Sequence, residues 1–295
     1  MKKSPPLALW IITISIFIVV QAIIFFIPSN KLDYGISYPR IDDSILKNNQ
    51  VTPIHKIMAI GSSITDEAIE KEEDIITLSQ ENGGEGLMIK KVTGVTDKLS
   101  LMINRFDLVN YLINEKPEAV CIQTELAAIQ LSPEHIFAPE QIVQITQDNK
   151  LFFKKLLNGF KDPPTDRLYW LNDELVIVKD TILFQGINRS IKSRKEAQNV
   201  FDFIQTLNKK GIKVYFLDIP RAHQFEDKYF TTNYKDSLNH LFELYKNETG
   251  SKRIQYTGPV MHFINYRDIG GHMNITGRKL YTRWLVNTIQ NELKK

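Results

Sequence analysis

The sequence is poor in cysteine: Cys121 is the only one in 295 residues. A single cysteine excludes an intrachain disulfide and any metal site built from several cysteines. Because Cys121 lies inside an apolar run, we interpret it as a small buried hydrophobe rather than a nucleophile. The sequence contains no metal-ligand spacing among His55, His135, His240 and His262. We therefore expect neither a metal nor another cofactor.

A strong excess of one charge is also missing. The 37 lysines and arginines nearly balance 34 aspartates and glutamates, and no long basic run is interleaved with aromatic residues. This distribution argues against nucleic acid as a partner. Internal repeats and low-complexity tracts are absent as well. With 43% hydrophobic and 24% charged residues, the composition is that of a folded globular protein.

One long stretch has no charge at all. Residues 7–27 read LALWIITISIFIVVQAIIFFI, with one glutamine as the most polar side chain. As a helix this run is about 30 Å long, which matches the hydrocarbon core of a bilayer. A cleavable signal peptide would end in small residues, whereas this run ends in bulky ones. A buried core helix seldom needs such a long uncharged run. We predict an uncleaved transmembrane anchor.

The flanks of this run give an orientation and a domain plan. Two lysines in residues 1–6 favour a cytoplasmic N-terminus, although Lys31 follows on the other side. The proline-containing residues 28–52 form a linker, and residues 53–295 have the size of a single domain. We expect a single-pass protein of the cell membrane whose domain lies on the extracytoplasmic side.

The domain alternates between strand-like and helix-like stretches. Short apolar runs at 57–61, 118–123 and 214–220 predict buried strands, and 193–210 predicts an amphipathic helix that Gly211 ends. This order indicates an α/β fold, a three-layer sandwich with a mostly parallel sheet. In such sheets ligands lie at the carboxyl ends of the strands.

The region between the second and third predicted strands is less regular. Residues 125–192 contain a predicted helix near 141–158, and we expect part of the region to form an insertion near the site. Asp218, Arg221 and His223 lie in or just after the third strand. They have the right position for substrate binding, but an ordinary polar turn explains them equally well.

A serine pair follows the first strand directly, in the run Gly61-Ser62-Ser63-Ile64-Thr65-Asp66, before a helix predicted from about Glu67. A serine at a tight strand-to-helix turn is exposed at the sheet edge. The helix N-terminus supplies amide hydrogens for an oxyanion. Ser63 is the candidate nucleophile. The alternative is that these hydroxyl side chains only cap the helix.

An acid and a histidine stand near the other end of the chain, in Asp268-Ile269-Gly270-Gly271-His272-Met273-Asn274, before the last predicted helix. His272 would accept the proton of Ser63, and Asp268 would orient the imidazole. A lone loop histidine is more often solvated or structural. The two signals at opposite ends of one domain together favour catalysis.

These motifs resemble those of the SGNH hydrolases, also called the GDSL esterase and lipase family. Gly61-Ser62-Ser63 is similar to the family's nucleophile turn, and His272-Met273-Asn274 with Gly277 is similar to its H-L-N-x-x-G run. The resemblance extends from about residue 55 to the C-terminus, with specific motifs only at its two ends. It implies the SGNH form of the flavodoxin-like sandwich, with Ser63, His272 and Asp268 as catalytic residues.

Two departures from the family pattern concern the oxyanion and the acid. The family uses a glycine and an asparagine as oxyanion donors; Gly94 matches the glycine, but Gln123-Thr124-Glu125 replaces the asparagine motif. Gln123 can donate through its side-chain amide, whereas an ionised Glu125 cannot donate. We expect the oxyanion donors to be Ser63, Gly94 and Gln123. Asp268 and His272 are four residues apart instead of three, so either the loop absorbs one residue or Asp268 is only structural.

The resemblance also implies a function. Tethered members of the family modify cell-surface polysaccharides, some with acyl groups supplied by a multi-span membrane acyltransferase, which becomes an expected partner beside the bilayer. The first hypothesis is a membrane-anchored serine esterase or O-acyltransferase acting on acyl, chiefly acetyl, esters of an extracytoplasmic glycan. The alternative is an inactive SGNH-like binding or assembly subunit of a cell-envelope complex. A lipase would need an apolar groove, which the sequence does not reveal.

Overall fold

The computed structural model describes three parts of the chain: residues 7–26, 54–129 except 82, 84, 94–98, 100–101 and 104–107, and 190–294 except 269–270. The chain divides into two compact units, residues 1–34 with 133–169 and residues 35–132 with 170–295. The sheet and the candidate site belong to the second unit. The helix expected near 141–158, the linker at 28–52 and Gly94 lie outside the described residues.

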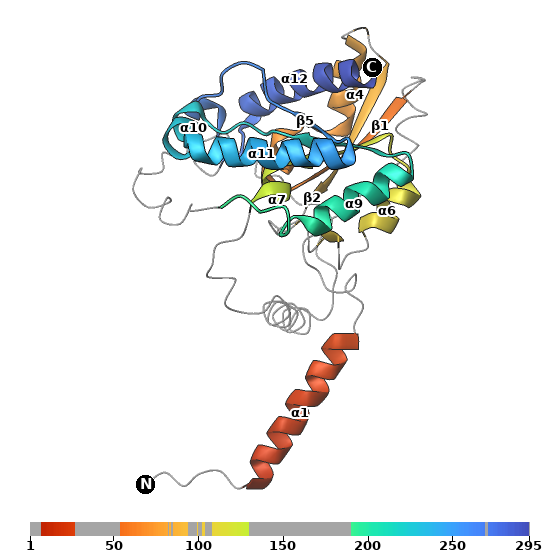
Figure 1. Cartoon of the computed structure of the whole chain (residues 1–295), viewed down its shortest axis with the longest axis vertical. Helices are drawn as coiled ribbons and strands as arrows, with labels where there is room; N and C mark the ends of the chain where they lie inside the picture. The colour runs from red at the N-terminus through yellow and green to blue at the C-terminus, as the bar shows by residue number, and fades with distance from the viewer. Residues whose placement is uncertain are drawn as a thin grey trace. The chain divides into compact units, whose positions relative to one another are not determined.

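The first unit contains one described helix, α1, from Leu7 to Phe26. Figure 1 shows it as a separate helix near the N-terminus. It is 20 residues long, has no acidic residue in its first turn and no basic residue in its last, and exposes large apolar side chains from Leu9 to Val19. Among the residues described, no helix combines the length and hydropathy needed to cross a membrane. The anchor over residues 7–27 stays a prediction.

The second unit is built on a five-stranded sheet with the order β2-β1-β3-β4-β5, in which every neighbouring pair is parallel. The strands are β1 (Ile54–Gly61), β2 (Gly86–Thr93), β3 (Ala119–Gln123), β4 (Lys213–Leu217) and β5 (Lys252–Ile254). The three predicted strands correspond to β1, β3 and β4. Since all strands run the same way, their carboxyl ends share one edge of the sheet, where the candidate residues lie.

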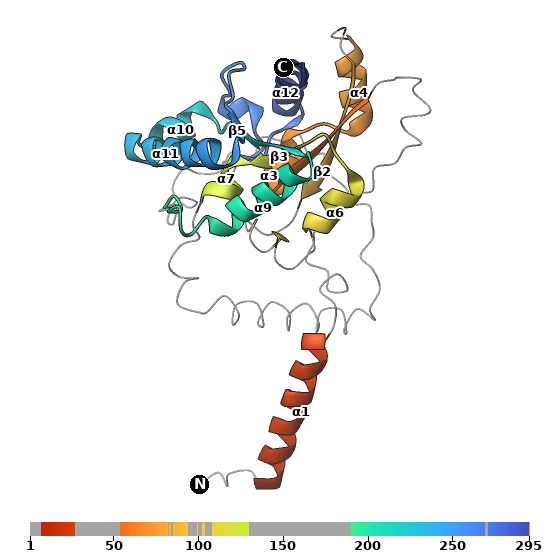
Figure 2. The same ribbon diagram turned by 45° about the vertical axis from the view of Figure 1, so that its right-hand side comes forward.

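Helices cover both faces of the sheet (Figure 2). One face carries α6 (Leu108–Glu115), α9 (Gln198–Lys209) and α11 (Thr232–Thr249), and the other carries α3 (Ser63–Ala68), α4 (Glu72–Glu81) and α12 (Ile275–Leu293). Alternate residues of β1 enter the two cores: Met58 packs in the first and Ile57 in the second. The three-layer α/β sandwich predicted from the sequence is confirmed.

Aromatic rings fix the first face. Phe216 of β4 lies 4.7 Å from Phe242 and 4.6 Å from Tyr245 between ring centroids, and Phe201 of α9 stacks on Tyr245 at 4.2 Å. Such ring pairs add about 1 kcal/mol each to the free energy gained from area burial. They hold α9 and α11 against β4, the strand whose carboxyl end carries Asp218.

The sequence analysis did not predict strands β2 and β5. In β2 the consecutive lysines Lys90 and Lys91 interrupt the apolar pattern of a buried strand. Lys90 is nevertheless buried, with its Nζ 3.2 Å from Glu72, while Lys91 Nζ donates to the carbonyl of Asp66 at 2.9 Å. Polar partners on α4 and α3 therefore let an edge strand bury one ammonium group and partly bury a second. Strand β5 has only three residues, too few for a pattern.

The start of the predicted helix at 193–210 was wrong. Helix α9 begins at Gln198, and Ser193 precedes it in a turn in which its backbone N and its Oγ both donate to Glu196 Oε2 at 2.7 Å. Local side-chain bonds of this kind compete with helical geometry. The predicted end holds: the helix stops at Lys209, and Gly211 follows with φ 77°.

Candidate active site

The nucleophile turn joins β1 directly to α3. Ser62 is the N-cap, and its Oγ accepts a hydrogen bond from the backbone N of Ile64 at 3.3 Å. The helix begins at Ser63, so the predicted start near Glu67 was four residues too late. Gly61 is required here because a Cβ at this position would lie 1.7 Å from Thr65 Oγ1. Ser62 caps the helix, so the Ser63 hydroxyl is not used for capping and is available as a nucleophile.

Gln123, at the end of β3, lies beneath this turn and is buried. Its Oε1 accepts hydrogen bonds from the backbone N of Ser62 at 2.9 Å, from Ser62 Oγ at 3.0 Å and from Thr65 Oγ1 at 2.9 Å. Its Nε2 donates to Glu125 Oε2 at 3.2 Å. One of the two amide hydrogens is therefore engaged, and only the second can serve an oxyanion. The structure gives Gln123 a supporting position that the sequence analysis did not foresee.

The loop that carries His272 is closed at its base. The backbone N of Arg267 donates to the carbonyl of His272 at 2.9 Å, and Tyr266 pairs with Met273 in an antiparallel bridge. Asn274 then caps α12 by accepting from the backbone N of Gly277 at 3.0 Å. Asn274 and Gly277 of the motif noted in the sequence therefore have a structural role. They form the start of the helix that follows the His272 loop.

The structure brings Ser63, His272 and Asp268 together from opposite ends of the domain. Ser63 Oγ lies 2.9 Å from His272 Nε2, and His272 Nδ1 lies 2.6 Å from Asp268 Oδ2. The second carboxylate oxygen, Asp268 Oδ1, accepts from the backbone N of His272 at 3.1 Å. One aspartate thus binds both the ring and the main chain of the same histidine. The contact forms although Asp268 and His272 are four residues apart.

Hydrogen-bond chemistry assigns the proton in this cluster. An ionised carboxylate only accepts, so His272 Nδ1 carries the hydrogen that Asp268 binds, and Nε2 keeps a lone pair for the Ser63 hydroxyl. Burial alone raises the pKa of Asp268, but the hydrogen bonds and electrostatic interaction with His272, together with the charge of Arg267, outweigh it and hold that pKa below its usual value. The His272 side chain is 23% exposed, so a substrate can reach it.

A partly buried ion pair connects the nucleophile helix with the histidine loop. Arg267 Nη2 pairs with Glu67 Oε1, and Arg278 of α12 donates through Nε to the carbonyl of Glu67 at 2.8 Å. Burial raises the pKa of Glu67, while His272 and Arg267 act in the opposite direction. Within the described part of the chain, Glu67 Oε2 and Arg267 Nε have no hydrogen-bond partner. Sequence reasoning missed this pair because 200 residues separate its members.

A second ion pair, of which only the arginine is buried, lies between Gln123 and the histidine loop. Arg221 is 7% exposed and bonds Glu125 through Nη2 at 2.6 Å and through Nε at 3.2 Å. Burial alone would lower the pKa of Arg221, but the charge and hydrogen bonds of Glu125 raise it. Arg221 also lies against Gly271, where a Cβ would be 1.9 Å from its Nη1. The series Gln123, Glu125, Arg221 and Gly271 therefore connects the nucleophile turn with the histidine loop.

The other candidates take separate positions. Asp218 pairs with Arg253 and lines a cavity, whereas His223 forms an exposed pair with Asp227 at 3.1 Å. Cys121 is buried, and burial raises the pKa of its thiol to about 12, which leaves it protonated at neutral pH. No cluster of metal-ligating side chains occurs among the residues that the structure describes.

The geometry defines a class of chemistry. A serine hydroxyl, an imidazole and a carboxylate in this order form the arrangement used for acyl transfer through serine, whatever the fold. The hydroxyl donates to a base, the base is oriented by an acid, and all three lie at the carboxyl edge of a parallel sheet.

Comparisons with known proteins give distant structural neighbours only. No family model and no curated protein matches the chain. Similar solved structures include TesA, with a TM-score of 0.43 and 13% identity over 80% of this chain and 98% of that chain. A lipase/acylhydrolase from Enterococcus faecalis has a TM-score of 0.41 and 13% identity over 81% and 96%. A GDSL-like lipase from Bacteroides thetaiotaomicron has 0.41 and 13% over 89% and 99%. At such scores the likeness supports no argument about activity, which rests on the site.

Proposed function

We propose that the protein is a serine esterase or O-acyltransferase of the SGNH type, acting on acyl, chiefly acetyl, esters of an extracytoplasmic glycan. The observation that carries this proposal is the contact of 2.9 Å between Ser63 Oγ and His272 Nε2, with Asp268 on the other ring nitrogen. The hydroxyl needs a base within hydrogen-bond distance to act as a nucleophile, and this contact provides one.

The reaction would proceed in two halves. Ser63 Oγ attacks the ester carbonyl as His272 Nε2 takes its proton, and collapse of the tetrahedral intermediate expels the glycan alkoxide, which takes that proton from Nε2. The acyl group is then held on Ser63. Water or a sugar hydroxyl, deprotonated by His272, attacks the carbonyl of this ester. The bond from the acyl group to Ser63 Oγ then breaks, Ser63 Oγ takes the proton back from His272 Nε2, and the carboxylic acid or the acylated sugar leaves. Water as acceptor makes the protein an esterase, and a sugar hydroxyl makes it a transferase.

The negative charge that develops on the carbonyl oxygen requires donors. The backbone N–H of Ser63 at the start of α3, the second amide hydrogen of Gln123 and the backbone of Gly94 are proposed for this role, the last from the family resemblance alone. Each such donor is worth about 3 kcal/mol of barrier. The Asp268 carboxylate, whose pKa is held low by His272, stabilises the imidazolium that forms at the same moment.

The glycan, the membrane location and the partner belong to the proposal as well. They are supported by the uncharged run at 7–27, by the helical form of Leu7–Phe26 and by the resemblance to tethered glycan-modifying members of the family. A tether on the extracytoplasmic face would keep the site near surface polysaccharides. A multi-span membrane acyltransferase would supply the acyl group if the reaction is a transfer.

One observation favours a second candidate, an SGNH-like binding subunit without activity. Gln123 was expected to replace the amide donor of the family's oxyanion asparagine, yet its carbonyl oxygen supports the nucleophile turn and one of its amide hydrogens is taken by Glu125. A weakened oxyanion site lowers the rate, whereas the support of the turn would remain useful to a binding protein.

Labelling with a fluorophosphonate probe separates the two candidates. We expect the probe to modify Ser63 in the wild type and in Ser237→Ala, a matched control at an exposed serine of α11, and not in Ser63→Ala or His272→Ala. Mass spectrometry of the tryptic peptides locates the adduct. Absence of labelling in the wild type would favour the binding subunit.

A further inference from the structure

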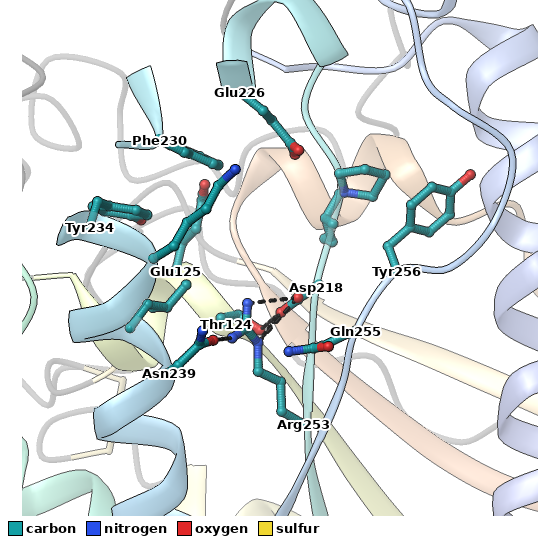
Figure 3. Close-up of a pocket in the computed structure, with 14 residues that line it drawn as sticks. Thr124, Glu125, Asp218, Glu226, Phe230, Tyr234, Asn239, Arg253, Gln255 and Tyr256 are labelled. Atoms are coloured by element: carbon teal, nitrogen blue, oxygen red, sulfur yellow. Dashed lines mark hydrogen bonds and ion pairs between the residues drawn. The ribbon is translucent and has the colours of Figure 1, made fainter. Parts of the chain in front are cut away.

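A cavity of about 450 Å³ opens at the carboxyl ends of β3, β4 and β5, between α11, the short helix α10 (His223–Tyr229) and the chain after β5 (Figure 3). Neither Ser63 nor His272 nor Asp268 lines it. The cavity therefore belongs to the same edge of the sheet as the triad but is not the triad's own surface. Its floor, its charges and its walls indicate what it can bind.

The floor is a fixed polar network around Asp218. Arg253 donates to this carboxylate through Nε at 2.9 Å and through Nη2 at 2.8 Å, and Thr124 Oγ1 donates to it at 2.5 Å. Arg253 Nη1 also donates to Asn239 Oδ1 at 2.8 Å. These bonds satisfy Asp218 and hold the Asn239 amide in a set orientation, with its nitrogen left for a ligand (Figure 3).

Most charges in the cavity wall have an opposite partner. Asp218 pairs with Arg253, which also lines the cavity, and Glu125 pairs with Arg221, which lies behind the lining. Burial raises the pKa of Glu226, and the attraction of Lys235 opposes that rise. A wall with balanced charges gives no net attraction to an anion or a cation. It suits a neutral ligand that exchanges several hydrogen bonds.

Aromatic rings form two opposite walls. Phe230 and Tyr234 stack at 4.9 Å with an interplanar angle of 18°, and Tyr256 lies across the cavity from them (Figure 3). Tyr256 is held by Trp284 at 4.7 Å and by a bond from its hydroxyl to the carbonyl of Pro259 at 2.7 Å. Flat apolar walls with neutral donors and acceptors between them match a sugar ring, which has C–H faces and a rim of hydroxyl groups.

We propose that this cavity binds one residue of a neutral oligosaccharide and so holds the glycan whose ester Ser63 attacks; the second clause rests on the proposed function. Ser63 follows β1, while the cavity is centred on β4, two strands further along the sheet. At about 4.8 Å per strand this is a separation of about 10 Å, which an oligosaccharide can bridge. Glu125, which lines the cavity, also binds the Gln123 amide beneath the nucleophile turn.

Binding can be tested without any activity. Calorimetric titration of the full-length Ser63→Ala protein would use cellopentaose, xylopentaose and penta-N-acetylchitopentaose. Lys235 and Gln255 line the cavity and are exposed, so replacing both with alanine spares the core. We expect at least one sugar to bind and the Lys235→Ala/Gln255→Ala change to raise its Kd about tenfold, for the loss of two hydrogen bonds.

Lys246→Ala is the matched control, since Lys246 is exposed on α11 but does not line this cavity. It should leave the Kd unchanged. Failure of all three sugars to bind, or an equal Kd in the cavity variant and the control, would overturn the proposal.

A second measurement tests the connection to Ser63. We expect the Lys235→Ala/Gln255→Ala change to lower, about tenfold, the ratio of kcat/KM for acetylated xylo-oligosaccharide to kcat/KM for 4-nitrophenyl acetate. An unchanged ratio would overturn the connection. If the wild type hydrolysed neither ester, the proposed function would fail, and the titration would still decide whether the cavity binds sugar.

Discussion

Two histidines lie at opposite ends of the parallel strands, and each is hydrogen-bonded through both ring nitrogens. His55, near the start of β1, contacts Glu118 through Nδ1 at 2.8 Å and Glu85 through Nε2 at 2.6 Å. His272, at the carboxyl edge, contacts Asp268 through Nδ1 at 2.6 Å and Ser63 through Nε2 at 2.9 Å. The distances are alike, and the second partner differs.

That difference decides what each imidazole can do. Two carboxylates require a hydrogen on both nitrogens, so His55 is held as an imidazolium without a lone pair to accept a proton. Burial alone lowers the pKa of His55, but Glu118 and Glu85 raise it above 6.5. His272 has one carboxylate and one hydroxyl, which leaves Nε2 as a base. The same residue type is a structural cation at one end and a candidate catalytic base at the other.

The largest effect should come from breaking the serine–imidazole contact. Ser63→Ala and His272→Ala are each expected to lower kcat for 4-nitrophenyl acetate by about 10⁴-fold or more, since the members of such a cluster act as a unit. His55→Ala should leave kcat within about twofold. An equal loss in His55→Ala would show that the carboxyl end is not the reactive end. Steady-state rates at pH 7.5 decide between these outcomes.

In both histidines Nδ1 contacts a carboxylate, and the next largest effect is expected from changing the carboxylate beside His272. Asp268→Asn should lower kcat by about 10³-fold to 10⁴-fold, because an amide at this position favours the wrong imidazole tautomer. The same change removes a carboxylate whose pKa is lowered by folding. The stability that it contributes is present above the unfolded pKa, near 3.9, and is lost as the pH falls through its folded value.

Urea unfolding of the wild type and Asp268→Asn should therefore show a gap that narrows as the pH falls below about 4. A gap that instead widened towards low pH would mean that Asp268 is not stabilised as a carboxylate. In that case the acid of the candidate triad would have to be sought elsewhere.

The three residues of this cluster were predictable from the sequence because each lies in a short motif. A serine pair after an apolar run and a histidine before an asparagine-capped helix depend on local geometry, which local sequence encodes. Placing both at one sheet edge then required only the parallel order of the strands. Asp268 was identified in spite of its spacing, since a loop with Gly271 at φ 96° tolerates an added residue.

The supporting residues were not predictable in the same way. Gln123 was expected as an oxyanion donor, and the structure directs its carbonyl to the nucleophile turn 61 residues away. The Arg221–Glu125 pair joins residues 96 apart, and no periodicity records such a pair. Strand β2 was missed because Lys90 finds its partner on another element. Side-chain pairing between distant elements is fixed by the fold and leaves no local signature.

The third prediction tests this supporting role. Gln123→Leu removes an acceptor for three donors and leaves the buried backbone N of Ser62 without a partner, which costs about 1–3 kcal/mol of unfolding free energy. Because Ser63 follows in the chain, we also expect kcat to fall about 10-fold to 100-fold.

Gln290→Leu is the matched control at the amino end of the strands. Gln290 is also buried, and its Nε2 donates to the carbonyls of Ser79 at 3.1 Å and Glu85 at 2.9 Å. It should lose similar stability in urea unfolding and keep its kcat. Equal kcat losses in both variants would mean that Gln123 acts only through global stability.

The smallest effect is expected at the other histidine. The pKa of His55 is raised in the folded state, so the stability contributed by its pairs with Glu118 and Glu85 is complete below 6.5, the unfolded value, and is lost as the pH rises through the folded value. His55→Gln should therefore lower the thermal midpoint more at pH 5.5 than at pH 8.5. The loss of unfolding free energy caused by this change should differ between the two pH values by at most about 1 kcal/mol, since the partner carboxylates are half exposed. A penalty that grew with pH would imply a neutral imidazole between two carboxylates and would remove the contrast with His272.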